Sequence, residues 1–139
     1  MTKVIIIKLN SMEILSISIS KEDLKSLESA QKRLGFNSRS KMLRSAIESL
    51  INDYDKLNEL KGNTESVFVL TYPDSEKNKV SDMLHRFEED INSEMHHHHH
   101  HTCIDILSLH TGADEVRRFF KEAKSNKSVR SVTYSIISN

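Results

Sequence analysis

The sequence is poor in cysteine, proline and glycine and has no long apolar run. Each of these shortages argues against one class of structure. Its only cysteine is Cys103, so no internal disulfide can form, as is typical of proteins in a reducing cytoplasm. One proline and three glycines in 139 residues leave little room for long loops. No apolar run approaches the roughly 20 residues that a membrane helix needs. We therefore expect a cytoplasmic protein without a membrane partner.

The chain also lacks an excess of charge of either sign. Twenty basic residues balance twenty acidic residues, which gives a formal net charge of zero. Any binding of nucleic acid must therefore depend on a local concentration of charge. A chain of this length forms one ordinary domain or two small ones, and two small domains would need oligomerisation to bury enough apolar surface.

The first half of the chain predicts a strand followed by two helices. In "ILSISISK" the residues alternate, so that Ile17 and Ile19 face a core while Ser16 and Ser18 face outward. Ser20 is suited to cap a helix that ends at Gly35. Asn37 or Ser38 then caps a second helix, whose apolar stripe comprises Met42, Leu43, Ala46, Ile47, Leu50 and Ile51.

About 45 residues arranged in this way cannot bury both helices in a single copy. Two copies can do so by pairing their strands into an antiparallel ribbon over four helices, and such a ribbon fits the DNA major groove. Ser16 and Ser18 would then face base edges. The groups expected at the DNA backbone surround the turn between the helices: Lys32, Arg33, Asn37, Ser38, Arg39 and Lys41.

Residues 13–52 resemble a ribbon-helix-helix repressor domain. The resemblance depends on the alternating strand, the glycine turn and the following "NSRSKMLRSAI", in which Arg39 and Ser40 match the family's Arg-Ser pair. It implies a dimer that binds double-stranded operator DNA through the strand, with Ser16 and Ser18 reading bases. The alternative is that these serines form the solvated face of an ordinary strand.

The second half predicts the order β-α-β-β-α-β of a ferredoxin-like domain over residues 67–139. We expect residues 61–66 to form a linker and residues 1–12 to form an arm or an extra strand. The uncertain element is the second strand of this domain, because only "NSEMHHHHHH" lies where it should be, and a shortened strand is one outcome. The fold class is therefore α+β, with an intertwined N-terminal dimer domain and a C-terminal ferredoxin-like (ACT-like) domain.

Six histidines, residues 96–101, lead almost directly into Cys103. Two histidines that are two positions apart on a strand point to one face, so either His97 and His99 or His96 and His98 could act together. Imidazole and thiolate ligands suit nickel, copper, cobalt or zinc better than magnesium or calcium. The competing interpretation is an inserted affinity tag beside a cysteine that belongs to the core.

A ribbon-helix-helix domain followed by a ferredoxin-like domain resembles the NikR-type nickel-responsive regulators. "TCIDILSLHTGADEV" is similar to the family's cysteine strand and second helix. The resemblance implies a tetramer formed by the C-terminal domains and a metal, with nickel favoured over copper, cobalt and zinc. It implies as ligands His97, His99 and Cys103, with His85 or Glu89 from a neighbouring chain. The family's separate HxH strand is replaced here by the histidine run.

These observations predict a metal-responsive DNA-binding transcriptional regulator, a repressor of metal-homeostasis genes. No nucleophile–base pair or carboxylate dyad stands out, so we do not expect an enzyme. Two alternatives stay open. In one, the C-terminal domain binds a small molecule or a protein partner instead of a metal. In the other, the histidine run serves to buffer metal.

Overall fold

The computed structural model describes residues 3–9 and 13–138 and divides into two compact units, Met1–Tyr54 and Asp55–Asn139. Each unit is described by itself below. Within the described ranges, no helix is both long enough and apolar enough to cross a membrane.

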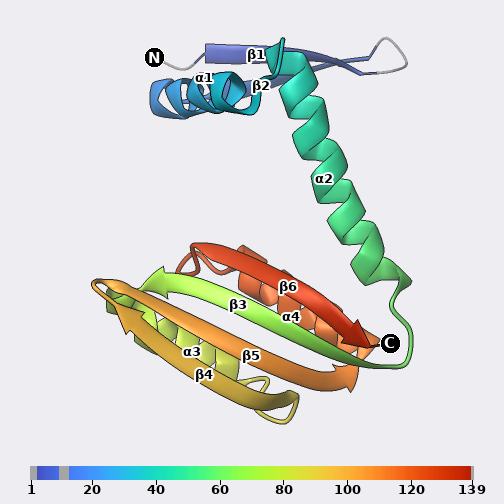
Figure 1. The fold of residues 1–139 in the computed structure, drawn as a ribbon, viewed down its shortest axis with the longest axis vertical. Coiled ribbons are helices and arrows are strands. Elements are labelled where there is room, and N and C mark those ends of the chain that lie inside the picture. The colour runs from blue at the N-terminus through green and yellow to red at the C-terminus, as the bar shows by residue number, and fades with distance from the viewer. Residues whose placement is uncertain (1–2, 10–12, 139) are drawn as a thin grey trace. The chain divides into compact units, whose positions relative to one another are not determined.

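The first unit consists of a two-stranded sheet and two helices. Strand β1 (Lys3–Leu9) pairs antiparallel with strand β2 (Glu13–Ile19), and α1 (Lys21–Leu34) and α2 (Arg39–Glu59) follow (Figure 1). Of the two predictions for the N-terminus, the extra strand is therefore the one observed. Ile5 of β1 lies opposite Ile17 of β2 and is buried against Leu24 of α1. The inward orientation predicted for the isoleucines of β2 is confirmed.

The ends of both helices follow the predicted chemistry. Ser20 Oγ accepts a hydrogen bond of 3.1 Å from the backbone N–H of Asp23, and Gly35 ends α1 in the left-handed region with a φ of 74°. Ser38 Oγ accepts a 3.1 Å bond from the N–H of Lys41. Of the two candidates at the second helix, Ser38 thus provides the capping oxygen.

The apolar stripe of α2 is largely uncovered within one chain. Leu50 is 64% exposed, Ile51 51% and Tyr54 63%. Within this stripe only Met42, near the start of the helix, is buried, whereas Leu57 near the end of α2 belongs to the core of the second unit. As the sequence predicted, a single copy of the first unit does not bury the apolar stripe of α2.

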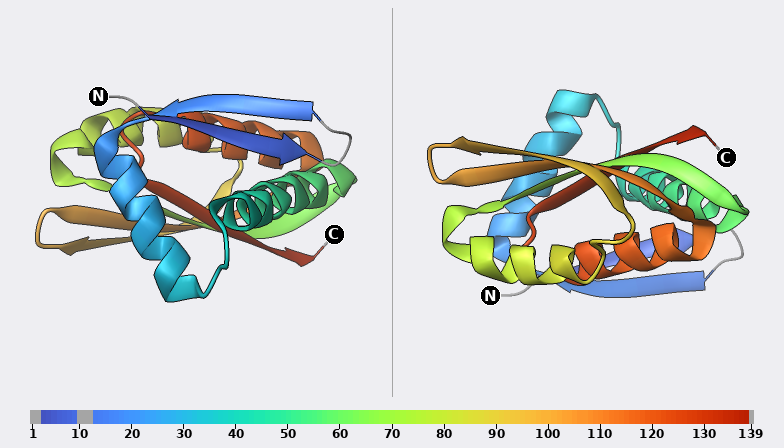
Figure 2. Two further views of the ribbon diagram at one scale, coloured as in Figure 1. Left: turned by 90° about the horizontal axis from the view of Figure 1, so that it is seen from above. Right: turned by 90° about the horizontal axis from the view of Figure 1, so that it is seen from below.

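The second unit is a four-stranded antiparallel sheet with helices on one face, as Figures 1 and 2 show. The order of strands is β4-β5-β3-β6, which is the ferredoxin-like arrangement. The predicted fold class is confirmed. The elements are β3 (Asn63–Pro73), the 3₁₀ helix η1 (Asp74–Glu76), α3 (Lys77–His85), β4 (Ile91–His99), β5 (Thr102–Gly112), α4 (Ala113–Ser125) and β6 (Ser131–Ser138).

Aromatic side chains join the helices to the sheet. The ring centroid of Phe119 on α4 lies 4.8 Å from that of Phe68 on β3 and 5.0 Å from that of Phe87, and both pairs meet edge to face. All three rings are fully buried. Edge-to-face pairs contribute about 0.5–1.5 kcal/mol each beyond the burial of their area. This cluster fixes both helices against the sheet.

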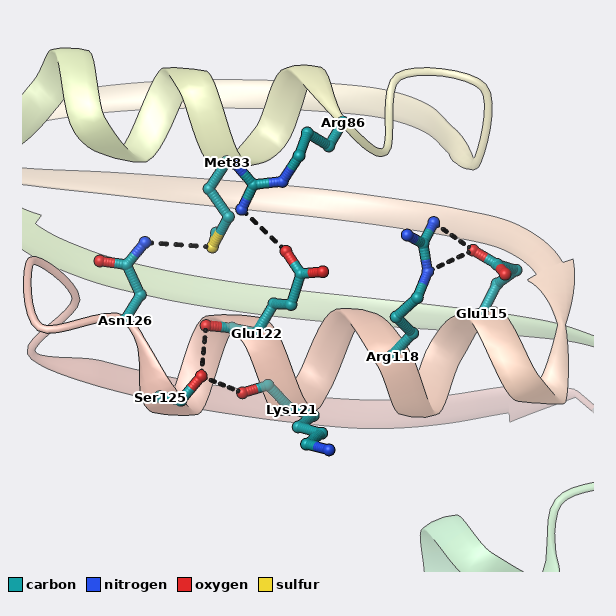
Figure 3. Close-up of polar contacts among 8 residues, drawn as sticks. All are labelled: Met83, Arg86, Glu115, Arg118, Lys121, Glu122, Ser125 and Asn126. Carbon is teal, nitrogen blue, oxygen red and sulfur yellow. Dashed lines mark hydrogen bonds and ion pairs between the residues drawn. The ribbon is translucent and has the colours of Figure 1, made fainter.

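Two polar contacts hold the two helices of this layer together (Figure 3). Arg86 at the end of α3 bonds to Glu122 on α4 at 2.8 Å, and Asn126 Nδ2 donates to the sulfur of Met83 at 3.5 Å. Arg118 bonds to Glu115 one turn before it on α4. These contacts fix α3 against α4. They therefore also fix the position of the α3 side chains that face β4.

The predicted linker at residues 61–66 is wrong over most of its length, because β3 already begins at Asn63. Thr64 lies opposite Thr111 and Ser66 opposite Leu109, and both polar side chains are buried. The polar composition of this segment concealed a strand. After β3 the short helix η1 comes before α3, and Glu76 is at the N-cap position of α3.

The second strand of the domain, which the sequence left uncertain, is present. β4 has nine residues and includes His96–His99, while β3 and β5 have eleven residues each. His100 and His101 form the turn into β5. The histidine run therefore takes the place of the strand and turn that a ferredoxin-like fold requires.

Candidate functional site

The pairing of β4 with β5 divides the histidines between the two faces of the sheet. His98 lies opposite Cys103 and His96 lies opposite Asp105. Cys103 and Asp105 are buried on the face that the helices cover. Partners in an antiparallel ladder share a face, so His96 and His98 belong to the face of Cys103.

His97 and His99, which we expected to act with Cys103, lie on the opposite face. Their partners are Ile104 and Thr102. The short turn at residues 100–101 fixes the register, and a slip of one residue would exchange the two faces. Of the two histidine pairs that the sequence left open, the structure brings His96 and His98 together with Cys103.

A buried carboxylate organises this face. Asp105 is 1% exposed and accepts two hydrogen bonds, one of 2.6 Å from the hydroxyl of Tyr72 and one of 2.5 Å from Nδ1 of His96. Burial, followed by the hydrogen bond to Asp105, raises the pKa of Tyr72, so the phenol remains a donor. With Nδ1 of His96 donating its proton, the lone pair of Nε2 is free for a ligand.

Cys103 is a free thiol in the middle of this arrangement. It is 1% exposed. Burial raises its pKa, the charges of Asp105 and Asp74 act in the same direction, and Lys77 opposes them. The neutral thiol is therefore the favoured form, whereas a metal binds the thiolate.

The tip of the hairpin is tied to the turn after β3. His98 Nε2 and His101 Nδ1 each lie 3.4 Å from the same oxygen of Asp74, and the N–H of Asp74 donates to the carbonyl of His101 at 3.0 Å. Desolvation alone would raise the pKa of Asp74, but the hydrogen bonds from the two histidines lower it. Asp74 thus holds His98 beside the position of Cys103.

A cleft of about 650 Å³ lies between α3 and β4. Tyr72, Asp105 and His96 line it from the sheet, and His85 at the end of α3 and Glu88 in the turn after it line the other side. His85 and Glu88 are joined by a contact of 3.0 Å and are largely exposed. The buried network therefore has access to solvent through this cleft.

The described residues of one chain do not by themselves form a metal site. Among the described residues, no group of three or more His, Cys, Asp or Glu side chains is arranged to hold a metal ion. The donor types on the Cys103 face suit a late first-row metal. His85 and Glu89, the residues expected from a neighbouring chain, are exposed.

In the first unit, Ser16 and Ser18 are exposed on the outer face of the β1–β2 sheet. Their partners on β1 are Ile6 and Val4, which are 61% and 60% exposed. The sequence alone did not predict these apolar neighbours, because residues 1–12 fit either an arm or an extra strand. The face that carries the serines is therefore half hydroxyl and half apolar.

The basic residues expected at a DNA backbone do surround the turn between α1 and α2. Lys32 and Arg33 are in the last turn of α1. Asn37 and Ser38 directly precede α2, and Arg39 and Lys41 lie in its first turn. Arg39 forms an ion pair with Glu28 of α1, which partly neutralises it.

Two family models match the chain in order. Residues 13–54 match the ribbon-helix-helix protein, copG family, and residues 69–137 match the NikR C terminal nickel binding domain. Together they cover the β2–α2 segment and most of the second unit.

Several curated relatives align with most of this chain. A putative nickel-responsive regulator of Methanocella arvoryzae is 26% identical over 91% of this chain and 94% of its own. A protein of the same description from Methanothrix thermoacetophila is 25% identical over 85% and 87%. Putative nickel-responsive regulator 2 of Methanosarcina mazei is 26% identical over 85% and 89%.

A solved structure shares part of the fold. An uncharacterized protein from Thermotoga maritima aligns with a TM-score of 0.51 at 20% identity, over 55% of this chain and 99% of that protein. Both domains, in the expected order and with relatives along nearly the whole length, lead to one assignment. The chain belongs to the NikR-like ribbon-helix-helix transcriptional regulators, a family of regulatory proteins and not of enzymes.

Proposed function

We propose that this protein is a metal-responsive repressor. Its first unit binds operator DNA, and its second unit binds a metal, for which nickel is the favoured choice. The observation that carries the proposal is the face of β4 and β5 on which His96 and His98 lie with Cys103. The name of the related proteins, putative nickel-responsive regulator, supports the choice of metal.

The ligands in this proposal are His96, His98 and Cys103, completed by His85 or Glu89 of a neighbouring chain. The pair His97 and His99 could join Cys103 only after a slip of one residue in the hairpin. A bound divalent metal would supply a charged centre that links chains and stabilises one arrangement of them. A square-planar site would select nickel or copper, and a tetrahedral one zinc or cobalt.

Dimer formation in this proposal uses two features of the first unit. The two-stranded sheet leaves one edge of β2 unpaired within the described residues, and an open edge is a template for pairing with a second copy. The exposed Leu50, Ile51 and Tyr54 of α2 offer apolar area that a second copy would bury. We further propose that the C-terminal units assemble two such dimers into a tetramer.

DNA recognition in this proposal combines base contacts from Ser16 and Ser18 with backbone contacts from the basic turn between α1 and α2. Hydroxyl groups discriminate modestly among bases, so the basic residues supply most of the affinity and make it dependent on salt. Metal binding changes the affinity for DNA only if the metal favours one arrangement of the chains.

The decisive experiment measures operator binding by the full-length protein with and without nickel, for the wild type and for Cys103→Ser. We expect nickel to change operator affinity by roughly 5- to 150-fold, the range of typical allosteric couplings, and we expect Cys103→Ser to abolish this change. Ser125→Ala is the matched control, because its hydroxyl bonds only to the backbone of its own helix. If Cys103→Ser retains the full response to nickel, Cys103 is a core residue and the proposed site is wrong.

A second candidate is the binding of a small molecule in the cleft between α3 and β4. Its volume of about 650 Å³ is within the range of ligand pockets, and Lys77, Glu88 and Glu94 provide charged groups on its walls. A regulator of this kind would respond to a metabolite and would retain its response in the presence of a metal chelator. The same operator-binding assay, carried out with a chelator, separates the two candidates.

A further inference from the structure

The strand pairing leaves His97 and His99 outside the site proposed beside Cys103. His97 and His99 alternate with His96 and His98, so they lie on the face of the sheet that the helices do not cover. Both are exposed. Among the residues that the structure describes, neither side chain makes a hydrogen bond or an ion pair. Two free imidazoles therefore lie on one side of a rigid strand.

The spacing of these imidazoles suits a chelate. Residues two apart on a strand are separated by about 6.6 Å, and their side chains point in the same direction. Imidazole nitrogens bind late first-row metals at roughly 2.0–2.1 Å. The two rings can turn toward a common ion between them, because both are exposed and neither is held by a hydrogen bond or an ion pair among the described residues.

A third imidazole stands at the end of this strand. The ring centroid of His100 lies 4.2 Å from that of His99. His100 is the one non-glycine residue in the described part of the chain with a positive φ, which is 52°. The left-handed region costs a non-glycine residue about 1–2 kcal/mol. The turn thus holds a strained histidine next to the free pair, where glycine or asparagine would be the usual choice.

We propose that His97 and His99 form a second metal site on the open face of the sheet, and that His100 becomes an additional ligand once the rings turn toward the bound ion. The site takes a divalent ion of the nickel, copper and zinc group, and water fills the remaining positions. The affinity order for a site made of imidazoles favours copper, followed by nickel and zinc. The histidine run then supplies ligands to both faces of one strand.

This second site is weaker than the one proposed beside Cys103. It lacks a thiolate, and its ligands have no carboxylate to orient them. Arg130 donates to the hydroxyl of Thr102, the residue opposite His99 in the ladder, and its positive charge opposes a cation nearby. The site contains no residue of the Cys103 face, so it does not depend on the proposed function.

The test compares two double variants of the full-length protein that each keep four of the six histidines in the run. His97→Gln/His99→Gln removes the open-face pair, and His96→Gln/His98→Gln removes the pair on the Cys103 face. Nickel and copper binding is measured by isothermal titration and by equilibrium dialysis, and circular dichroism shows whether each variant is folded. Cys103→Ser, tested in parallel, reports on the first site alone.

We expect the wild type to bind two ions per chain with different affinities. His97→Gln/His99→Gln should lose the weaker ion and keep the tighter one, and Cys103→Ser should do the reverse. His99→Gln alone should weaken the second site by at least about tenfold, since one arm of the chelate is lost. If His96→Gln/His98→Gln does not fold, the single variant and Cys103→Ser still decide the question.

Three results would overturn the second site. These are a wild type that binds only one ion per chain, a weaker ion that survives His97→Gln/His99→Gln, or equal losses in the two double variants. Equal losses would mean that the run binds metal as an unstructured polyhistidine. If instead Cys103→Ser leaves both ions in place, the proposed function fails while the second site stands.

Discussion

His96 donates a hydrogen bond of 2.5 Å from Nδ1 to the buried carboxylate of Asp105. This contact fixes the orientation of the ring on the Cys103 face, and Tyr72 holds the same carboxylate from the neighbouring strand. Metal-binding histidines are commonly held by a carboxylate in this way. Asp105 is therefore a positioning residue in the proposed site.

Replacing Asp105 with Asn should weaken metal binding by about 10- to 100-fold, the usual cost of losing a carboxylate that orients a histidine ligand. The amide cannot hold the imidazole through the same charge-assisted bond. Nickel affinity is measured by competition with a chelator of known affinity. Tyr72→Phe, which removes one donor and leaves the carboxylate, should have a smaller effect. Equal affinities for Asp105→Asn and the wild type would show that the contact is only structural.

Replacing Ser16 and Ser18 with Ala should reduce binding to operator DNA more than binding to unrelated DNA, because hydroxyl contacts to bases carry sequence information and backbone contacts do not. Arg33→Gln should weaken both kinds of binding together and lower the dependence on salt. Fluorescence anisotropy at several salt concentrations measures both effects. Equal loss on both DNAs in the serine variant would exclude base reading by β2.

Leu50→Lys should break the dimer of the first unit. In the proposed assembly this side chain enters an interface between copies, and burying an unpaired charge there is costly. Sedimentation equilibrium should show dissociation at concentrations where the wild type is associated. Ser49→Lys adds the same charge to an exposed neighbouring position of α2 and should leave the association unchanged. If Leu50→Lys assembles as the wild type does, α2 is not in the interface.

Ser66→Ala should stabilise the protein by about 1 kcal/mol, since it removes a buried polar group without a partner. Among the described side chains, Ser66 Oγ is buried and makes no hydrogen bond. Urea denaturation measures the free energy of unfolding. Thr64→Ala is the comparison, because the Thr64 hydroxyl bonds to the carbonyl of Gly62 at 3.4 Å, and its removal should not stabilise. A loss of stability in Ser66→Ala would indicate that the hydroxyl has a partner in the assembled protein.

Glu76→Gln should cost stability at neutral pH but not in acid. Lys79 and then Ser128 bond to Glu76 and lower its pKa from the ordinary value of 4.5. A lowered pKa in the folded state gives stability that is present above the unfolded value and is lost as the pH falls through the folded value. The difference between the urea midpoints of wild type and variant should therefore shrink below about pH 4.5. A difference that does not change with pH would assign the effect to packing.

Much of the first unit could be predicted from the sequence because its signals are local. The alternation around Ile17, the cap at Ser20 and the glycine at position 35 each act within a few residues, and the structure shows all three. The strand at Thr64 was missed because its polar residues resemble a linker. Their burial depends on β5, which lies far away in the sequence.

The candidate site shows where local signals end. The sequence identified Cys103 and the histidine run, but not Asp105 or Tyr72. The available signal was that Asp105 lies two positions after Cys103 and so faces the same side of the strand. A carboxylate in a strand is usually exposed, and its burial follows only from Tyr72 and His96 on the two neighbouring strands.

By itself, the amino-acid sequence determined the elements, the order of the domains and the types of metal ligand, because periodicity, capping and donor chemistry are properties of short segments. Only the tertiary structure decided which histidines share a face with Cys103. Every residue in the run is a histidine, so its sequence contains no alternation that could set the register. The turn and the ladder with β5 set it instead.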